Sequence, residues 1–67
     1  MHHLTSSAIT EVAHDAATAS LAIRFTSGEA YAYRGVPAEV YAALLAAPSK
    51  GAFFQAHIRD VYPFVRL

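Results

Sequence analysis

Residues 21–33, LAIRFTSGEAYAY, constrain the fold more than any other part of the chain. On both sides of a Ser27-Gly28 pair, large apolar residues alternate with small or polar residues. This period of two is typical of a strand with one buried face. Two such runs joined by a short loop that contains glycine predict a β-hairpin, one face of which is covered by the rest of the molecule.

The length of the hairpin loop decides which face carries the two tyrosines of the second run. A two-residue loop, 27–28, would place Arg24 opposite Tyr31 and would leave both tyrosine rings exposed as an aromatic platform. A three-residue loop, 26–28, closed by a left-handed glycine, would place Ile23 opposite Tyr31 and would turn both rings into the core. We favour the second register because it gathers the five large apolar residues of the hairpin on one face.

A further strand is predicted before the hairpin, over residues 7–14, SAITEVAH. Ile9 and Val12 are out of strict phase in this run, which indicates either a β-bulge or a change of exposed face between them. Residues 15–18 form the connecting turn, so the three strands make an antiparallel meander. A three-stranded sheet with one apolar face needs a cover.

A first helix, which supplies part of that cover, is predicted over residues 37–47. Pro37 suits the first helical position, where a missing N–H costs nothing, and Glu39 suits the positive end of the helix dipole. Pro48 then ends the helix. The face that would cross the sheet consists of Val40, Tyr41, Leu44 and Leu45.

A second helix is predicted over residues 50–62, with Ser49 as its N-cap and a proline directly after its end. Its apolar face would consist of Phe54, Ile58 and Val61. The tail, residues 64–67, either docks back as an extended cover or remains loosely held. The predicted fold class is therefore α+β, a three-stranded antiparallel meander with two C-terminal helices packed on one face, in a single domain over residues 1–67.

Composition narrows the classes of function. The chain has no cysteine, so it offers no disulfide and no thiolate metal site, and nothing points to an oxidising compartment. Five basic residues balance five acidic ones, which removes the generic argument for nucleic-acid binding unless the fold gathers the basic side chains. There is no signal-peptide pattern and no apolar run long enough to cross a bilayer. We expect a cytoplasmic protein without a membrane partner.

The sequence favours a binding module over an enzyme. Its serines lie in turn or capping contexts, and no histidine has an evident oriented carboxylate, so no nucleophilic triad is indicated. His2 and His3 are adjacent, and adjacent side chains on an extended segment point to opposite sides. We therefore predict no metal site, no cofactor and no catalytic residue.

Short motifs follow one another in a characteristic order over nearly the whole chain. They are the hairpin positions Leu21, Ile23, Phe25, Gly28, Tyr31 and Tyr33, followed by Val36-Pro37, Val40-Tyr41, Leu44-Leu45, Ala47, Ser49, Gly51, Phe53-Phe54, Ile58-Arg59 and Tyr62. This order resembles the KTSC domain family, named for a C-terminal domain of some lysyl-tRNA synthetases. The family also includes short, free-standing bacterial proteins. One departure is His14, which stands where the family often has an aromatic residue. The synthetase context implies RNA as a ligand.

The most specific polar feature is the predicted start of the second helix, Ser49-Lys50-Gly51. Free N–H groups, the helix dipole, a hydroxyl and an ammonium group could together hold a phosphate or carboxylate. An ordinary helix cap is the alternative. If an anion binds there, Arg34 or Arg59 could complete the site as a bidentate partner.

These candidates support two hypotheses of function. In the leading one the ligand is RNA: Lys50, Arg34 and Arg59 neutralise phosphates, while the edges of Tyr31 and Tyr33 stack on unpaired bases. In the alternative, the chain is a protein-interaction module or a homodimer that uses an exposed sheet edge or apolar patch. RNA binding should weaken steeply with added salt, whereas apolar association should not.

Overall fold

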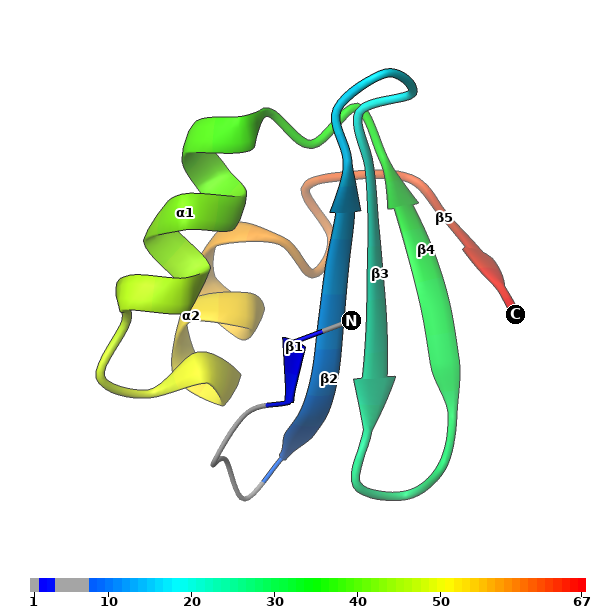
Figure 1. The fold of residues 1–67 in the computed structure, drawn as a ribbon. Helices are drawn as coiled ribbons and strands as arrows, with labels where there is room; N and C mark the ends of the chain where they lie inside the picture. Colours follow the sequence, from blue (N-terminus) through cyan, green and yellow to red (C-terminus); the bar gives the residue numbers. More distant parts are fainter. Residues whose placement is uncertain (1, 4–7) are drawn as a thin grey trace.

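The chain folds into one antiparallel sheet with two helices on one side. The computed structural model describes the backbone of residues 2–3 and all of residues 8–67. The elements are, in order, β1 (His2–His3), β2 (Ile9–Asp15), β3 (Ser20–Phe25), β4 (Ala30–Arg34), α1 (Ala38–Ala46), α2 (Lys50–His57) and β5 (Phe64–Arg66). The strand order is β1-β2-β3-β4-β5, and Figure 1 shows α1 and α2 on the same side of the sheet. The α+β class is confirmed.

The sheet is wider than the predicted three strands. The meander of β2, β3 and β4 is present as predicted. β1 adds to one edge by pairing with β2, and β5 adds to the other edge by pairing with β4, both antiparallel. The prediction of three strands is therefore wrong. The helices are also not the last elements, because the chain returns to the sheet after α2.

The hairpin adopts the three-residue loop. Tyr31 lies opposite Ile23, which is the favoured register. The amide of Gly28 donates to the carbonyl of Phe25 over 2.9 Å. Gly28 has a φ of 96°, a left-handed value that glycine adopts without strain. Tyr31 and Tyr33 consequently lie on the covered face, where Tyr33 is 5% exposed and Tyr31 is half-buried.

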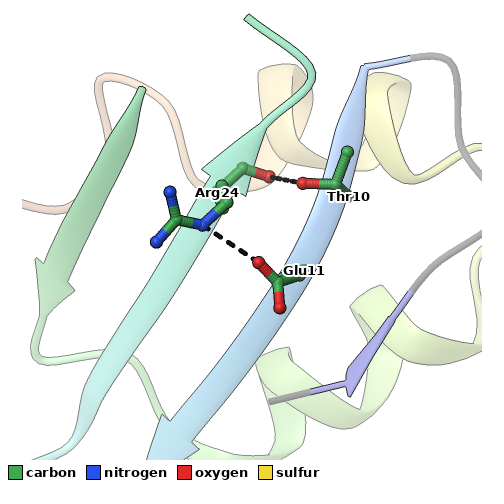
Figure 2. A network of polar contacts seen from close by, with 3 residues as sticks. All are labelled: Thr10, Glu11 and Arg24. Atoms are coloured by element: carbon green, nitrogen blue, oxygen red, sulfur yellow. Dashed lines mark hydrogen bonds and ion pairs between the residues drawn. The ribbon is translucent and has the colours of Figure 1, made fainter. Parts of the chain in front are cut away.

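β2 contains the predicted bulge. Its register with β3 shifts between Ile9 and Glu11, which leaves Thr10 as the extra residue. Figure 2 shows how this segment is held: the Thr10 hydroxyl donates to the Arg24 carbonyl over 3.2 Å, and Arg24 Nε lies 2.9 Å from Glu11 Oε1. Because the extra residue changes the phase of the strand, Ile9 and Val12 are both fully buried.

α1 forms with the predicted apolar face. Leu44 is fully buried, and Val40, Tyr41 and Leu45 are partly buried against the core. The helix begins at Ala38, one residue later than predicted. Pro37 has a ψ of 155°, which is extended backbone, so this proline is the N-cap and not the first helical residue.

α2 begins as predicted but ends earlier. The Ser49 hydroxyl accepts from the amide of Ala52 over 3.2 Å, so the predicted N-cap is confirmed. The helix ends at His57, because the chain must turn back for residues 64–66 to pair with β4. Asp60 takes a left-handed φ of 63° in this turn.

The early end of α2 also changes its predicted apolar face. Phe54 and Ile58 are buried in the core as expected. Val61 lies beyond the helix and is 59% exposed, so its predicted place on the buried face is wrong.

The core lies between the sheet and the two helices. β2, β3, β4, both helix regions and the β4–α1 connection contribute to it. Its buried members are Ile9, Val12, Leu21, Ile23, Tyr33, Val36, Leu44, Phe54 and Ile58. Among the residues whose burial the structure describes, none of the buried side chains is charged or polar apart from the Tyr33 hydroxyl.

Candidate functional site

A hollow of about 450 Å³ lies beside the β4–β5 edge of the sheet. We call it the aromatic groove. The β3–β4 hairpin, α2 and the segment that leads into β5 all contribute to its lining. Its rings are Phe25, Tyr31, Tyr33, Phe54 and Phe64, and its long polar side chains are Glu29, Gln55, Arg59 and Asp60. Sequence and fold therefore place rings and hydrogen-bonding groups in one concave surface.

Tyr31 is at the centre of the ring cluster. Its ring lies edge-on to Phe25 at 5.8 Å and edge-on to Phe64 at 5.4 Å, measured between centroids. Tyr33 lies behind it, with its centroid 6.5 Å from that of Tyr31. Phe64 is 56% exposed, so the outermost ring of the groove is open to a ligand. Exposed ring faces of this kind can stack on planar ligands.

The charges at the groove are balanced and only partly paired. Glu29 accepts a hydrogen bond of 2.8 Å from the Tyr31 hydroxyl, and its other carboxylate oxygen lies 3.8 Å from the Arg66 guanidinium. The hydrogen bond to Glu29 raises the pKa of Tyr31. Arg59 and Asp60, by contrast, form no ion pair within the described part of the chain. Arg59 is therefore the cation at this groove that is free to meet a ligand.

Four of the seven predicted binding residues meet at the groove. They are Tyr31, Tyr33, Gly51 and Arg59. Tyr33 contributes through packing because it is nearly excluded from solvent, and burial raises the pKa of its hydroxyl. Arg34 is not part of this lining. It pairs with Ser20 in the β3–β4 ladder, so by strand alternation its side chain lies on the sheet face away from the helices.

The start of α2 has structural partners of its own. The Lys50 ammonium donates to the carbonyl of Ala47 at the end of α1. The Ser49 hydroxyl caps α2, as described above. A Cβ at Gly51 would lie only 3.2 Å from the Cβ of Ala8, so the glycine allows close packing there. Anion binding at this helix start stays a prediction, and it would require Lys50 to leave Ala47.

Several residues of the groove are not indicated by the sequence. Phe64 lies in a tail for which the sequence leaves two placements open, because a run of three residues is too short to show a strand period. Nothing in the spacing of Glu29, Gln55 and Asp60 predicts that they converge. The proline before Phe64 and the alternation after it were the available signals for a strand.

The described histidines have packing partners. His14 stacks on Tyr41 with a centroid distance of 5.2 Å, and its Nε2 lies 2.7 Å from the Val36 carbonyl oxygen. The ring thus takes an aromatic residue's place in the packing. His57 lies against Phe53 at 4.6 Å. The predictions for the His2 and His3 side chains, and for the strand start at residue 7, fall outside the described part of the chain.

Among the described residues, no three histidine, aspartate or glutamate side chains gather closely enough to hold a metal ion. No helix there combines the length and apolar character that a membrane crossing would need.

The fold and groove define a small α+β domain, and comparisons with known proteins identify its family. The model of the KTSC domain matches residues 5–62, so the chain belongs to the KTSC domain family. A protein from Tsukamurella paurometabola is 42% identical over 67 residues, which is the full length of both chains. The crystal structure of a KTSC domain protein from Yersinia pestis is similar to this fold with a TM-score of 0.96 and 29% identity. That match covers 98% of this chain and 93% of the other.

Proposed function

We propose that this KTSC domain is a small non-enzymatic binding module that takes unpaired RNA bases into the aromatic groove. The observation that carries the proposal is the convergence of Tyr31, Phe64 and Arg59 on one groove. Planar bases stack on aromatic side chains, and this mode of recognition is typical for single-stranded RNA. The four polar side chains of the lining supply donors and acceptors for a base edge.

The roles of the residues follow from their exposure and pairing. Phe64, the most open ring, stacks on the base, and Tyr31 supports Phe64 from the sheet. Arg59 contacts a neighbouring phosphate, since it has no ion pair in the described part of the chain. Arg34 lies on the other face of the sheet, so we do not include it in this groove.

The charge balance sets the expected strength of binding. Arg59 and Arg66 are offset at the groove by Glu29 and Asp60, and the chain as a whole carries no net charge. Few phosphates can therefore be neutralised, and counterion release contributes little. We expect binding to be weak, with a shallow salt dependence of about 0.7 per phosphate contact.

A titration of an unstructured, fluorescently labelled oligouridylate against the 67-residue chain tests the proposal. Arg59→Ala should weaken binding and lower the salt slope by about 0.7. Phe64→Ala should weaken binding by about fivefold or more and leave the salt slope unchanged, because stacking involves no counterion. Measuring both quantities separates the phosphate contact from the base contact.

Arg24→Ala is the matched control. It removes the same charge, but Arg24 lies opposite Ala30 in the ladder, on the sheet face away from the groove, and it pairs with Glu11. Its affinity and slope should stay close to those of the wild type. If the wild type does not bind the oligonucleotide at low salt, the RNA proposal is wrong. If Arg59→Ala and Arg24→Ala weaken binding equally and Phe64→Ala has no effect, contact is through overall charge and the groove is not the site.

A further inference from the structure

Among the described residues, the exposed large apolar side chains all lie in the segment 61–67, which contains the edge strand β5. They are Val61, Phe64, Val65 and Leu67, with exposed fractions of 59%, 56%, 43% and 68%. Three of them belong to β5 or follow it directly. Figure 1 shows β5 at the outer edge of the sheet, beyond β4. By strand alternation Phe64 lies on the helix side of the sheet and Val65 on the other side, so both faces of this edge strand carry an exposed apolar side chain. An exposed apolar edge strand marks an interaction site.

The backbone of β5 is also open toward the outside. The Arg34 amide donates to the Pro63 carbonyl over 2.8 Å, and the Leu67 amide donates to the Ala30 carbonyl over 2.9 Å. In an antiparallel ladder alternate residues direct both backbone groups to the same side. Residues 63, 65 and 67 therefore face β4, and the N–H and C=O groups of Phe64 and Arg66 point away from the sheet.

We propose that β5 pairs with β5 of a second copy of this chain to form a symmetric homodimer. Antiparallel pairing about a two-fold axis at Val65 places Phe64 opposite Arg66 of the partner subunit. The two residues of each such pair then exchange both backbone hydrogen bonds, so the outward-facing groups of Phe64 and Arg66 are satisfied in both copies. The two sheets become one continuous sheet.

Side chains support this register. In it, Phe64 and Arg66 lie on the helix side, where an arginine over a phenyl ring gives a favourable cation–π contact. Val65 lies on the other side of the sheet and meets Val65 of the partner subunit. Arg66 does not face itself, and its charge is already balanced by Glu29 at 3.8 Å within the same chain. The edge therefore lacks the uncompensated charge that usually protects an edge strand from pairing.

A second copy fits this edge better than an unrelated peptide, because the three-residue strand is complementary to itself. β5 is short, so the interface lies at the small end of known interfaces. We expect a weak dimer with a Kd of about 10–100 µM. The proposal does not rest on RNA binding, and its test uses no RNA.

Sedimentation equilibrium of the 67-residue chain from about 10 µM to about 1 mM measures the assembly directly. The apparent mass should rise from 7.2 kDa toward twice that value. Val65→Lys and Val65→Glu each place like charges opposite one another at the axis, so each should weaken association by about fivefold or more. A mixture of the two variants should recover association, because opposite charges then meet.

Val61→Lys is the matched control. Val61 is similarly exposed but lies outside β5, so this variant should associate like the wild type. Arg66→Pro adds a backbone test, because it removes an N–H that points outward and no bond to β4, whereas Arg66→Ala keeps that N–H. We expect Arg66→Pro to dissociate the dimer more than Arg66→Ala does. Circular dichroism and denaturant unfolding of each variant check that the monomer stays folded.

The proposal is wrong if the wild type remains monomeric over the whole concentration range. It is also wrong if the wild type dimerises and the mixture of Val65→Lys and Val65→Glu does not recover association. A third outcome also excludes the homodimer. If the wild type stays monomeric and its β5 amide resonances shift when an extended apolar peptide is added, the edge binds another protein.

Discussion

Tyr33 lies directly opposite Leu21 in the β3–β4 ladder, and both side chains are nearly excluded from solvent. Tyr33→Ala should therefore lower the free energy of unfolding by about 3 kcal/mol or more, the usual result of truncating a buried aromatic side chain. Tyr31 lies two residues earlier on the same face and is half-buried, so Tyr31→Ala should lower the free energy of unfolding by less, about 2 kcal/mol. Denaturant unfolding of both variants gives the comparison.

The corresponding phenylalanine variants control for the hydroxyl groups. Tyr31→Phe loses only a solvent-exposed hydrogen bond to Glu29. It should therefore lower the free energy of unfolding by much less than Tyr31→Ala does. Near-wild-type stability of Tyr33→Ala would contradict the burial of this ring.

The tyrosine hydroxyls should make stability depend on alkaline pH. Burial raises the pKa of Tyr33 above the ordinary value of 10.0, and the hydrogen bond to Glu29 raises that of Tyr31. A raised pKa means that the folded chain keeps protons that the unfolded chain loses. Their stabilising contribution is fully present below about pH 10 and is lost as the pH rises through the folded-state pKa.

Two measurements check this pH dependence. Denaturant unfolding between neutral pH and about pH 11 should show a falling free energy of unfolding, with a smaller fall in Tyr33→Phe. Titration of tyrosinate absorbance should show that part of the signal from the four tyrosines ionises late. Ionisation of all four together near pH 10 would argue against the shifts.

Lys50 offers a test of its two candidate roles. Its ammonium donates to the carbonyl of Ala47, where a cation also suits the end of α1. We expect Lys50→Ala to lower the free energy of unfolding by about 1 kcal/mol. If the start of α2 also binds phosphate, the same variant should lower RNA affinity and reduce the salt slope by about 0.7. Unchanged affinity and slope would exclude the anion site and would leave the role in helix capping.

Glycines at two positions should respond to alanine for different reasons. Gly28 has a left-handed φ of 96° and open space around its Cβ position, so Gly28→Ala should cost about 1 kcal/mol through backbone strain alone. Gly28→Asn should cost less, because asparagine tolerates this conformation. Gly51→Ala instead brings a methyl group within 3.2 Å of the Ala8 Cβ. Ala8→Gly should therefore relieve Gly51→Ala but not Gly28→Ala, as thermal unfolding of the double variants would show.

Local patterns in the sequence determined the central hairpin, its register, the bulge in β2 and the start of α2. Each of these depends on neighbours within a few residues. Alternation sets the faces of a strand, a glycine permits the left-handed loop, and the Ser49 hydroxyl meets an amide three residues away. Such signals can be recognised in the sequence without knowledge of the tertiary structure.

Only the tertiary structure decided where the chain goes after Ile58, and with it the composition of the groove. Pairing of residues 64–66 with β4 ends α2 early, exposes Val61 and brings Phe64 against Tyr31. The physical reason is that pairing between distant segments depends on which sheet edge is free and on the path of the chain, and a three-residue strand carries too little periodicity to indicate its partner.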